Sequence, residues 1–327
     1  MKKIELLQDL NQVDLVNVFT TGLYKKIISN PLYSDLSQEF YMEYYDKKWK
    51  NLSMVLFCDD KPAALLLIFF EKEASYFGLP GVLFVDEEFS LFEDEFARLL
   101  LDEISERLEE ENCVKIQLYG SSAIHNYYDK KNVVGVEVAY IDLKKPMEVI
   151  KRDVRKSYKS LINWGLKNFS ITVIDDNNLD RYAFQKFMNF HREVSGRITR
   201  TDKTWDIQYR MICRGEAFAL LAYFEGKIVS ATFIMHSQVE AYYGVGVYDR
   251  KLMGEGKPLT HGVLYKAIEI CKSKGMKTFI LGETNTFSSI KEENIVKFKT
   301  GFTKSSFIRE HIEVKMDKLH KELYLKK

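Results

Sequence analysis

The sequence predicts an α/β protein of the α+β type, with two tandem domains that each contain a mixed central sheet flanked by helices. Three observations lead to this prediction. The chain has 327 residues, which is enough for two domains of ordinary size. Two apolar segments interrupted by a polar turn, residues 54–70 and 219–235, occur in corresponding places along it. Each is followed by an amphipathic helix and another short strand, so the chain reads as an internal repeat.

The two apolar segments are predicted to be β-hairpins. The first turns at residues 59–61 (Asp-Asp-Lys) and the second at residues 225–227 (Glu-Gly-Lys). An acidic residue followed by Gly suits a hairpin turn, because Gly accepts the positive φ that such turns require. We therefore expect the two hairpins, and the helices that follow them, to superpose.

The elements after each hairpin also correspond. Residues 74–78 (Ala-Ser-Tyr-Phe-Gly) parallel residues 241–244 (Ala-Tyr-Tyr-Gly). Helical periodicity then predicts helices over 93–110 and 259–274, and short strands follow at 114–118 and 278–281. A crossover helix makes its flanking strands parallel, so each half should combine an antiparallel hairpin with a βαβ unit.

The halves are predicted to join near residues 142–146, which gives domains of 1–143 and 144–327. A helix is predicted from Pro146, because Pro suits the first helical turn. Its exposed face is basic, with Lys151, Arg152, Arg155, Lys156 and Lys159. That face is either an ordinary solvated surface or a contact for tRNA phosphates or a lipid headgroup. A further helix is predicted over residues 180–194.

Composition excludes several classes of protein. Hydrophobic residues make up 46% and aromatic residues 13%, which excludes a disordered chain, and the net charge of +1 gives no global attraction to nucleic acid. The longest apolar run, residues 63–70, is too short for a bilayer, which needs about 20 residues. The four cysteines are far apart in sequence and form no metal-ligand or disulfide pattern. We expect a cytoplasmic protein without a transmembrane segment or a metal.

The second half carries an ordered set of motifs. They are the basic helix 155–165 (Arg-Lys-Ser-Tyr-Lys-Ser-Leu-Ile-Asn-Trp-Gly), 225–231 (Glu-Gly-Lys-Ile-Val-Ser-Ala), 242–244 (Tyr-Tyr-Gly), 275–282 (Gly-Met-Lys-Thr-Phe-Ile-Leu-Gly) and 298–302 (Phe-Lys-Thr-Gly-Phe). The set resembles the FemABX family of peptidyltransferases and its acetyltransferase-like relatives, which duplicate the GNAT acyltransferase fold. The resemblance covers residues 145–315 well and the first half in outline.

The resemblance implies an enzyme that acylates an amine. Its donor would be acyl-CoA or acetyl-CoA, or else aminoacyl-tRNA. Its acceptor would be a small molecule, a sugar nucleotide or a precursor of the cell envelope or cell wall. No long heptad insertion is present, so the helical arm of some tRNA-using members is missing. No Gly-rich turn precedes the first-half helix, so residues 1–143 are expected to be a degenerate scaffold or the acceptor side.

The expected donor site is the turn at residues 251–257 (Lys-Leu-Met-Gly-Glu-Gly-Lys), which resembles the pyrophosphate-binding turn of GNAT enzymes. Glycines allow backbone N–H groups to approach phosphate, and the following helix N-terminus adds partial positive charge. Glu255 and Pro258 oppose this interpretation, because one adds negative charge and the other lacks an N–H; an ordinary Gly-rich loop is the alternative. The predicted donor contacts are Lys251, Gly254, Gly256, Lys257 and Thr260.

The predicted catalytic residues are Glu283 and Tyr243. Glu283 ends the last crossover strand, at the sheet edge where α/β folds place ligands, and its carboxylate could accept a proton from an attacking amine. Tyr242 and Tyr243 alternate on their strand, so only one of them faces the cleft. Since no nucleophile–base pattern stands out, direct attack by the acceptor amine is expected. The other predicted substrate contacts are Arg197, Arg200, Tyr242, His261, Asn285 and Phe298.

Alternatives remain open from sequence alone. For Arg197 and Arg200 the alternative is a solvated loop, for Glu283 a surface loop, and for His261 a structural position in the core. A tRNA-dependent aminoacyl transferase acting on a peptidoglycan precursor is the second enzymatic hypothesis. The third hypothesis, of a different class, is a duplicated scaffold that binds a partner without catalysis.

Overall fold

The computed structural model describes residues 1–12, 18, 22–127, 132–285 and 289–315. The chain falls into two compact units. The first contains Met1–Ile27, Tyr45–Val136 and the described residues from Ile308 onward, and the second contains Ile28–Tyr44 and Glu137–Phe307. These units differ from the contiguous halves 1–143 and 144–327, because residues 28–44 and 137–143 cluster with the second unit and residues 308–315 cluster with the first.

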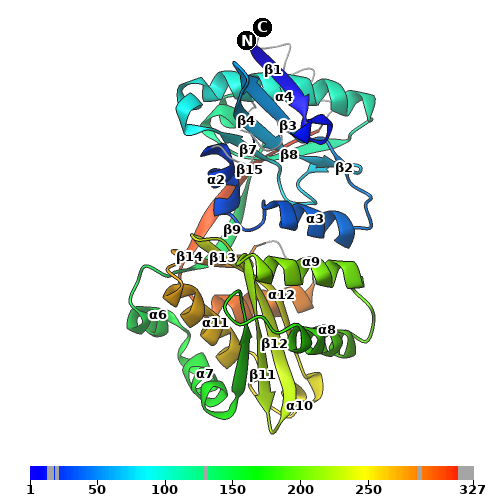
Figure 1. Cartoon of the computed structure of the whole chain (residues 1–327). Helices are drawn as coiled ribbons and strands as arrows, with labels where there is room; N and C mark the ends of the chain where they lie inside the picture. The colour runs from blue at the N-terminus through cyan, green and yellow to red at the C-terminus, as the bar shows by residue number, and fades with distance from the viewer. Residues whose placement is uncertain (13–17, 19–21, 128–131, 286–288, 316–327) are drawn as a thin grey trace. The chain divides into compact units, whose positions relative to one another are not determined.

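The first unit is built on strands that pair in the antiparallel order β1-β3-β4-β7 (Figure 1). A parallel bridge between Gly81 and Leu118 then places β8 beside β7. The elements of this unit are β1 (Lys2–Leu6), η1 (Leu7–Asp9), β2 (Lys50–Asn51), β3 (Met54–Cys58), β4 (Lys61–Leu67), β5 (Phe69–Phe70), β6 (Ala74–Ser75), β7 (Val82–Val85), η2 (Glu87–Phe92), α4 (Glu93–Glu110), β8 (Lys115–Tyr119) and α5 (Ser122–Tyr127).

The second unit has a sheet in the order β10-β11-β12-β13-β14-β9. Its elements are α3 (Asp35–Tyr44), α6 (Met147–Asp153), α7 (Lys156–Asn168), β10 (Ser170–Ile174), α8 (Arg181–Ser195), α9 (Asp202–Cys213), β11 (Ala217–Phe224), β12 (Lys227–His236), β13 (Glu240–Tyr248), α10 (Arg250–Gly254), α11 (His261–Ser273), β14 (Thr278–Glu283) and α12 (Ile290–Thr300). The residues of α2 (Gly22–Ser29), β9 (Val133–Asp142) and β15 (Ser306–Lys315) divide between the two units.

The strand order confirms the internal repeat. In each unit an antiparallel run of four strands is followed, after a crossover helix, by a fifth strand parallel to the fourth. The hairpin turns also match: φ is 49° and 63° at Asp59 and Asp60, and 50° and 78° at Glu225 and Gly226. Two successive positive φ values define the type I′ turn that suits the twist of paired strands.

The helix predicted from Pro146 is in fact two helices. The chain is extended at Val154 and Arg155, with ψ of 138° and 136°, and this separates α6 from α7. The backbone N–H of Arg155 donates to the carbonyl of Gly301 at 2.8 Å, so it cannot close a turn of a continuous helix. The partner lies far away in sequence, which is why local periodicity did not reveal the break.

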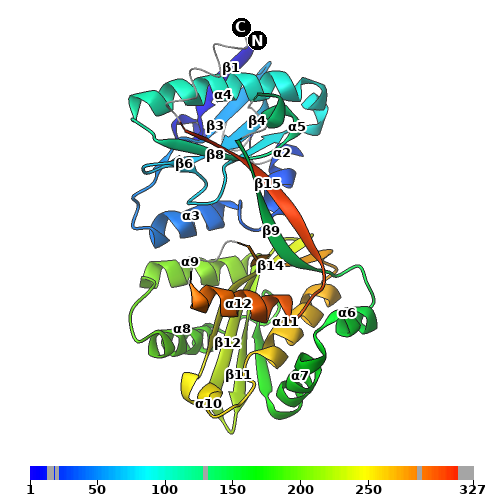
Figure 2. The same ribbon diagram turned by 180° about the vertical axis from the view of Figure 1, so that it is seen from behind.

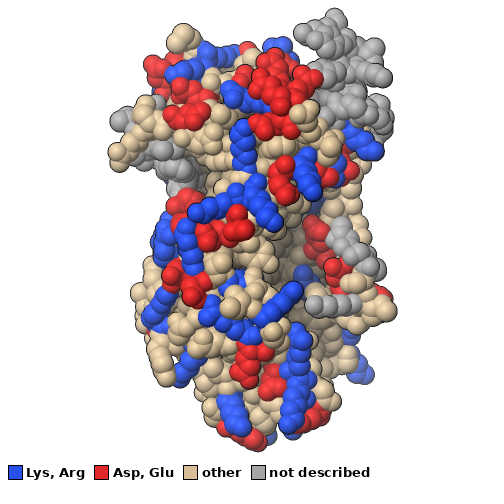
Figure 3. Space-filling model, turned by 90° about the vertical axis from the view of Figure 1, so that its right-hand side faces the viewer, with Lys and Arg blue, Asp and Glu red and all other residues tan. Residues whose placement is uncertain are grey.

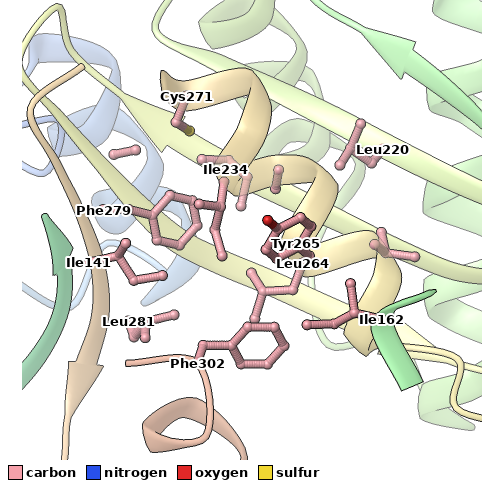
Figure 4. Packing of buried hydrophobic residues seen from close by; sticks show 14 of the residues in the cluster. Ile141, Ile162, Leu220, Ile234, Leu264, Tyr265, Cys271, Phe279, Leu281 and Phe302 are labelled. Atoms are coloured by element: carbon pink, nitrogen blue, oxygen red, sulfur yellow. The ribbon is translucent and has the colours of Figure 1, made fainter. Parts of the chain in front are cut away.

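Helices cover both faces of the second-unit sheet. Figures 1 and 2 show α7 and α11 on one side of β11 and β12, and α8 and α9 on the other. Figure 4 shows part of the core on the α7–α11 side, where Leu281 of β14 lies close to Phe302 and Phe279 of the same strand lies beside Ile234. Leu264 and Tyr265 of α11 fill the space between that strand and α7. Burial of this apolar surface holds α11, and therefore its N-terminus, in a fixed place on the sheet.

Three ion pairs hold α3 against α9. Arg214 makes two hydrogen bonds of 2.8 Å with Asp35, Arg210 binds Glu39 at 2.9 Å, and Lys203 pairs with Glu43 at 3.0 Å. Burial alone would raise the pKa of Asp35, but the pair with Arg214 outweighs it and holds the pKa below its ordinary value. The acidic residues follow one another at four-residue spacing, so they form one stripe on α3.

Charges of both signs are interspersed on the face of the molecule drawn in Figure 3. This agrees with the balanced composition and shows no large field of one sign on that face. In the part of the chain that the structure describes, no helix has the length and apolarity needed to cross a membrane.

Candidate functional site

The site is built where two parallel strands separate. β13 pairs with β14 at only three positions, Glu240 to Tyr242. On its other side β13 pairs with β12 as far as Tyr248, the last residue of β13. A bulge interrupts this pairing, so that Gly244 has no opposite residue in the register of β12. Among the described residues, the β14-facing edge of β13 beyond Tyr242 therefore has no strand partner. Unpaired strand N–H and C=O groups can bind an extended ligand.

A cleft of about 1090 Å³ opens at this point, within the second unit. Its walls come from α7, the end of α8, the separated part of β13, α10, the start of α11 and α12. Four predicted site residues line it together: Tyr243, Thr260, His261 and Phe298. The wall also contains apolar side chains, among them Leu161, Ile290 and Ile295, and a volume of this size suits a small-molecule ligand.

Tyr243 packs its hydroxyl against the backbone of Gly246, where any Cβ would overlap it. Burial raises the pKa of Tyr243 to about 12, so the phenol is neutral at physiological pH. A neutral phenol can donate a proton or a hydrogen bond, and here the hydroxyl also shares a side-chain hydrogen bond with Thr232. Tyr242 lies in the part of the strand that is still paired with β14, opposite Ile280, and is not among the lining residues.

The N-terminus of α11 opens into the cleft. Within the described residues, its N-cap, Thr260, makes no side-chain capping hydrogen bond, and Nδ1 of His261 is buried without a partner. Burial lowers the pKa of His261 to about 4, so the ring is neutral, and it stands edge-on to Tyr158 and Phe298 with ring centroids 4.4 and 5.3 Å apart. A helix N-terminus carries partial positive charge and unpaired N–H groups, which suit an anionic ligand.

The predicted donor turn has a different local structure. Residues 250–254 form α10, because Asp249 Oδ1 accepts hydrogen bonds from the N–H groups of Lys251 and Leu252 at 2.9 and 3.0 Å. Only Gly256, with a φ of +85°, needs glycine for its backbone conformation. The Lys257 ammonium lies over the rings of Trp164 and Phe224. Lys251, Gly254, Gly256 and Lys257 do not line the cleft, and their donor contacts stay a prediction.

The remaining predicted contacts are dispersed. Arg197 is exposed after the end of α8. Arg200 lies among His191, Tyr44 and Trp205 rather than in the cleft wall. Asn285 accepts a hydrogen bond from the N–H of Glu137 at 2.9 Å.

Lys299 is a site residue that the sequence reasoning missed. It lines the cleft from α12, and its Nζ lies only 2.7 Å from where a Cβ of Gly282 would be. Burial lowers the pKa of Lys299, and the carboxylate of Glu283 opposes that shift, so Glu283 and Lys299 are electrostatic neighbours. The signal was present, since Lys299 is the lysine of the Phe-Lys-Thr-Gly-Phe motif from which only Phe298 was selected. The described residues contain no cluster of three His, Cys, Asp or Glu suited to a metal.

The sequence matches no protein-family model and no curated protein. The structure is similar to several solved structures. FemX has a TM-score of 0.60 and 13% identity, with 95% of this chain and 96% of that chain covered. L-PGS from Bacillus licheniformis has a TM-score of 0.57 and 13% identity, covering 92% and 91%. A tandem GNAT protein from the clavulanic acid biosynthesis pathway has a TM-score of 0.52 and 11% identity, covering 97% and 99%.

These similarities extend over nearly the whole of both chains. They confirm the predicted fold, a FemABX-like duplication of the GNAT fold with a mixed sheet in each copy.

Proposed function

We propose that the protein is an acyltransferase that moves an acyl group from acyl-CoA, such as acetyl-CoA, to an amine of a small molecule, a sugar nucleotide or a cell-envelope precursor. The observation that carries the proposal is the cleft at the separation of β13 and β14, in a fold that it shares with GNAT proteins. Among the described residues, the cleft combines a strand edge without a strand partner, an open helix N-terminus and a half-buried lysine, Lys299.

The cleft fits the chemistry of coenzyme A. The pantetheine arm of coenzyme A is extended and carries two amides. These amides could pair with the edge of β13 beyond Tyr242. Its pyrophosphate would be stabilised at the N-terminus of α11, near Thr260 and Arg250. The part of the donor that extends beyond the pyrophosphate would contact Lys251, Gly254, Gly256 and Lys257.

The reaction needs one nucleophilic substitution at the thioester carbonyl. The amine nitrogen forms the new C–N bond, the C–S bond breaks, the nitrogen loses a proton and the sulfur gains one. Lys299 would stabilise negative charge on the carbonyl oxygen, and neutral Tyr243 would supply the proton to sulfur. Glu283, beside Lys299, would accept the amine proton directly or through water.

Calorimetric titration with acetyl-CoA tests the donor site. We expect binding by the wild type and roughly tenfold weaker binding by Arg250→Gln, with pantetheine binding unchanged because it lacks the pyrophosphate. Lys227→Gln, at the exposed hairpin turn, is the matched control. Absence of acetyl-CoA binding at millimolar concentration, together with no acylated product in a mass-spectrometric amine screen, would reject the proposal and favour the scaffold hypothesis.

The basic side chains of α6 and α7 favour a second candidate, a tRNA-dependent aminoacyl transferase. Lys151, Arg152 and Lys156 are all exposed. Each phosphate contact releases counterions, so tRNA affinity should fall steeply with salt. Filter binding of charged tRNA, abolished when these three are changed to Glu but kept in Lys227→Glu, would support this candidate, which would act on a peptidoglycan precursor.

A further inference from the structure

The end of α8 carries a buried polar chain that the proposed reaction does not use. His191 is only 6% exposed. Its Nε2 lies 2.9 Å from Nη1 of Arg200, and its Nδ1 lies 3.5 Å from Oγ of Ser195. Ser195 lines the cleft. The three side chains therefore lead from the protein interior to the cleft wall.

The chemistry of arginine fixes the direction of both hydrogen bonds. A guanidinium has five N–H donors and no acceptor, so Nε2 of His191 must accept from Arg200 and carry no proton. A neutral imidazole then holds its proton on Nδ1. That N–H faces Oγ of Ser195, which accepts it. The short Arg200 contact thus selects the tautomer in which Ser195 is the acceptor.

The hydroxyl group of Ser195 still has its own O–H to donate. Its hydroxyl oxygen accepts the hydrogen bond from the Nδ1–H of His191, and no hydrogen bond donated by its own O–H is found within the described part of the chain. Aromatic packing holds the other two groups in place: Arg200 packs on the ring of Trp205, with 5.5 Å from Cζ to the centroid, and Trp205 packs edge-on to His191. Because Ser195 lines the cleft, its O–H can donate to a molecule bound there.

We infer that Ser195 is a specificity-determining residue of the cleft, whose hydroxyl donates a hydrogen bond to an oxygen of the amine substrate, and that Arg200 and His191 are positioning residues that hold it as a donor. This inference rests on the proposed function, which places the acyl donor at β13 and α11 and leaves the α8 wall to the acceptor. The substrate class is an amine with a hydroxyl, carbonyl or sugar-ring oxygen near the nitrogen.

The tautomer can be tested without any ligand. In protein labelled with ¹⁵N-histidine, we expect His191 to show a protonated Nδ1 and an unprotonated Nε2 from pH 8 to pH 5. Arg200→Met should release the tautomer, so that signals of the Nε2–H form appear. A wild-type spectrum with the proton on Nε2, or titration of His191 near pH 6.5, would overturn the inference.

Substrate selection tests the role of the hydroxyl. We compare kcat/KM for matched amines, ethanolamine against propylamine and glucosamine against cyclohexylamine. The wild type should prefer the oxygen-bearing member of a pair about tenfold, because an unmatched donor in the site is costly. Ser195→Ala should bring the ratio to near one without changing KM for acetyl-CoA. Ser273→Ala, which removes a hydroxyl bonded within α11, is the control. A ratio that persists in Ser195→Ala would overturn the inference.

If no amine is acylated, the proposed function fails, and the donor role of Ser195 is decided by titration with N-methylacetamide, a carbonyl acceptor. Amide shifts around Ser195 should saturate in the wild type and be lost in Ser195→Ala. Equal shifts in both proteins would overturn the donor role.

Discussion

Gly165 of α7 and Gly262 of α11 lie directly against each other, with no side chain between their backbones. A Cβ on Gly262 would be 2.9 Å from the Cα of Gly165, and a Cβ on Gly165 would be 3.0 Å from the Cα of Gly262. Real Cβ atoms essentially never come as close as the one on Gly262 would, and the one on Gly165 would lie at the tight limit, so the closeness of this helix contact depends on both residues being glycine. The contact brings α7 onto the first turn of α11, and both helices line the cleft.

Gly165→Ala should therefore push α7 away from the start of α11. We expect a loss of about 1–3 kcal/mol in the free energy of unfolding, typical of overpacking, and weaker acetyl-CoA binding. Urea unfolding and calorimetry measure the two effects. Gly254→Ala is the control for the unfolding measurement, because its Cβ would meet nothing within 4 Å and its φ is not positive. Wild-type stability of Gly165→Ala would contradict the packing argument.

Lys299→Met should lower turnover about 10²–10³-fold, the usual effect of removing one group that stabilises an oxyanion. The measurement is steady-state kinetics with acetyl-CoA and an accepted amine. Lys297→Met removes a cation from the same helix, one that is 61% exposed and paired with Glu293. If the two variants are equally active, Lys299 has no catalytic role.

Glu283→Gln keeps the shape of the side chain and removes its basicity. If the carboxylate accepts the amine proton, turnover should fall about 10²–10⁴-fold and the pH–rate profile should lose one ionisation. Donor affinity should stay within a factor of a few. A variant as fast as the wild type would mean that the amine loses its proton to water or to another group.

Stability should fall as the pH drops from 6.5 to 4. Burial lowers the pKa of His191, with Arg200 and Arg192 adding to the effect, and burial lowers that of His261; both reach about 4. Burial also lowers the pKa of His236. In this pH range these histidines bind protons in the unfolded chain but not in the folded chain. Their contribution to the free energy of unfolding is therefore fully present above pH 6.5 and is lost as the pH falls.

Each strongly shifted histidine contributes at most about 1.4 kcal/mol per pH unit to this loss. Urea midpoints at pH 7, 6 and 5 measure the slope. Replacing both His191 and His261 with Phe should flatten it, and an unchanged slope would assign the acid sensitivity to other groups.

The repeat was predictable because its signals are local. The turns at Asp59-Asp60 and Glu225-Gly226 show their type in their composition, and the helix predicted over residues 93–110 has those bounds in the structure. The break before α7 was not predictable, since it depends on the carbonyl of Gly301.

The site shows the same limit. Tyr243, Thr260, His261 and Phe298 were identified from motifs and lie together in the cleft. Ser195 was missed, because its importance comes from where α8 ends rather than from its neighbours in sequence. Lys299 lies inside a motif that the sequence does show, but its position beside Gly282 and Glu283 is visible only in three dimensions. Arg200 was noted for its charge, but its contact with His191 could only be seen in three dimensions.

The clustering of residues 28–44 with the second unit has a consequence for protein engineering and for gene history. The helix α3 precedes residue 137 in the chain and is bound to α9 through Arg210 and Arg214. The coding DNA of the second unit is therefore interrupted by the codons for residues 45–136, which belong to the first unit. An expression clone that starts at residue 144 would leave these arginines without their carboxylates and would expose the α3-binding face of α9. The module cannot be exchanged between genes as one cassette, so recombination must transfer both segments together or create a new partner for α9.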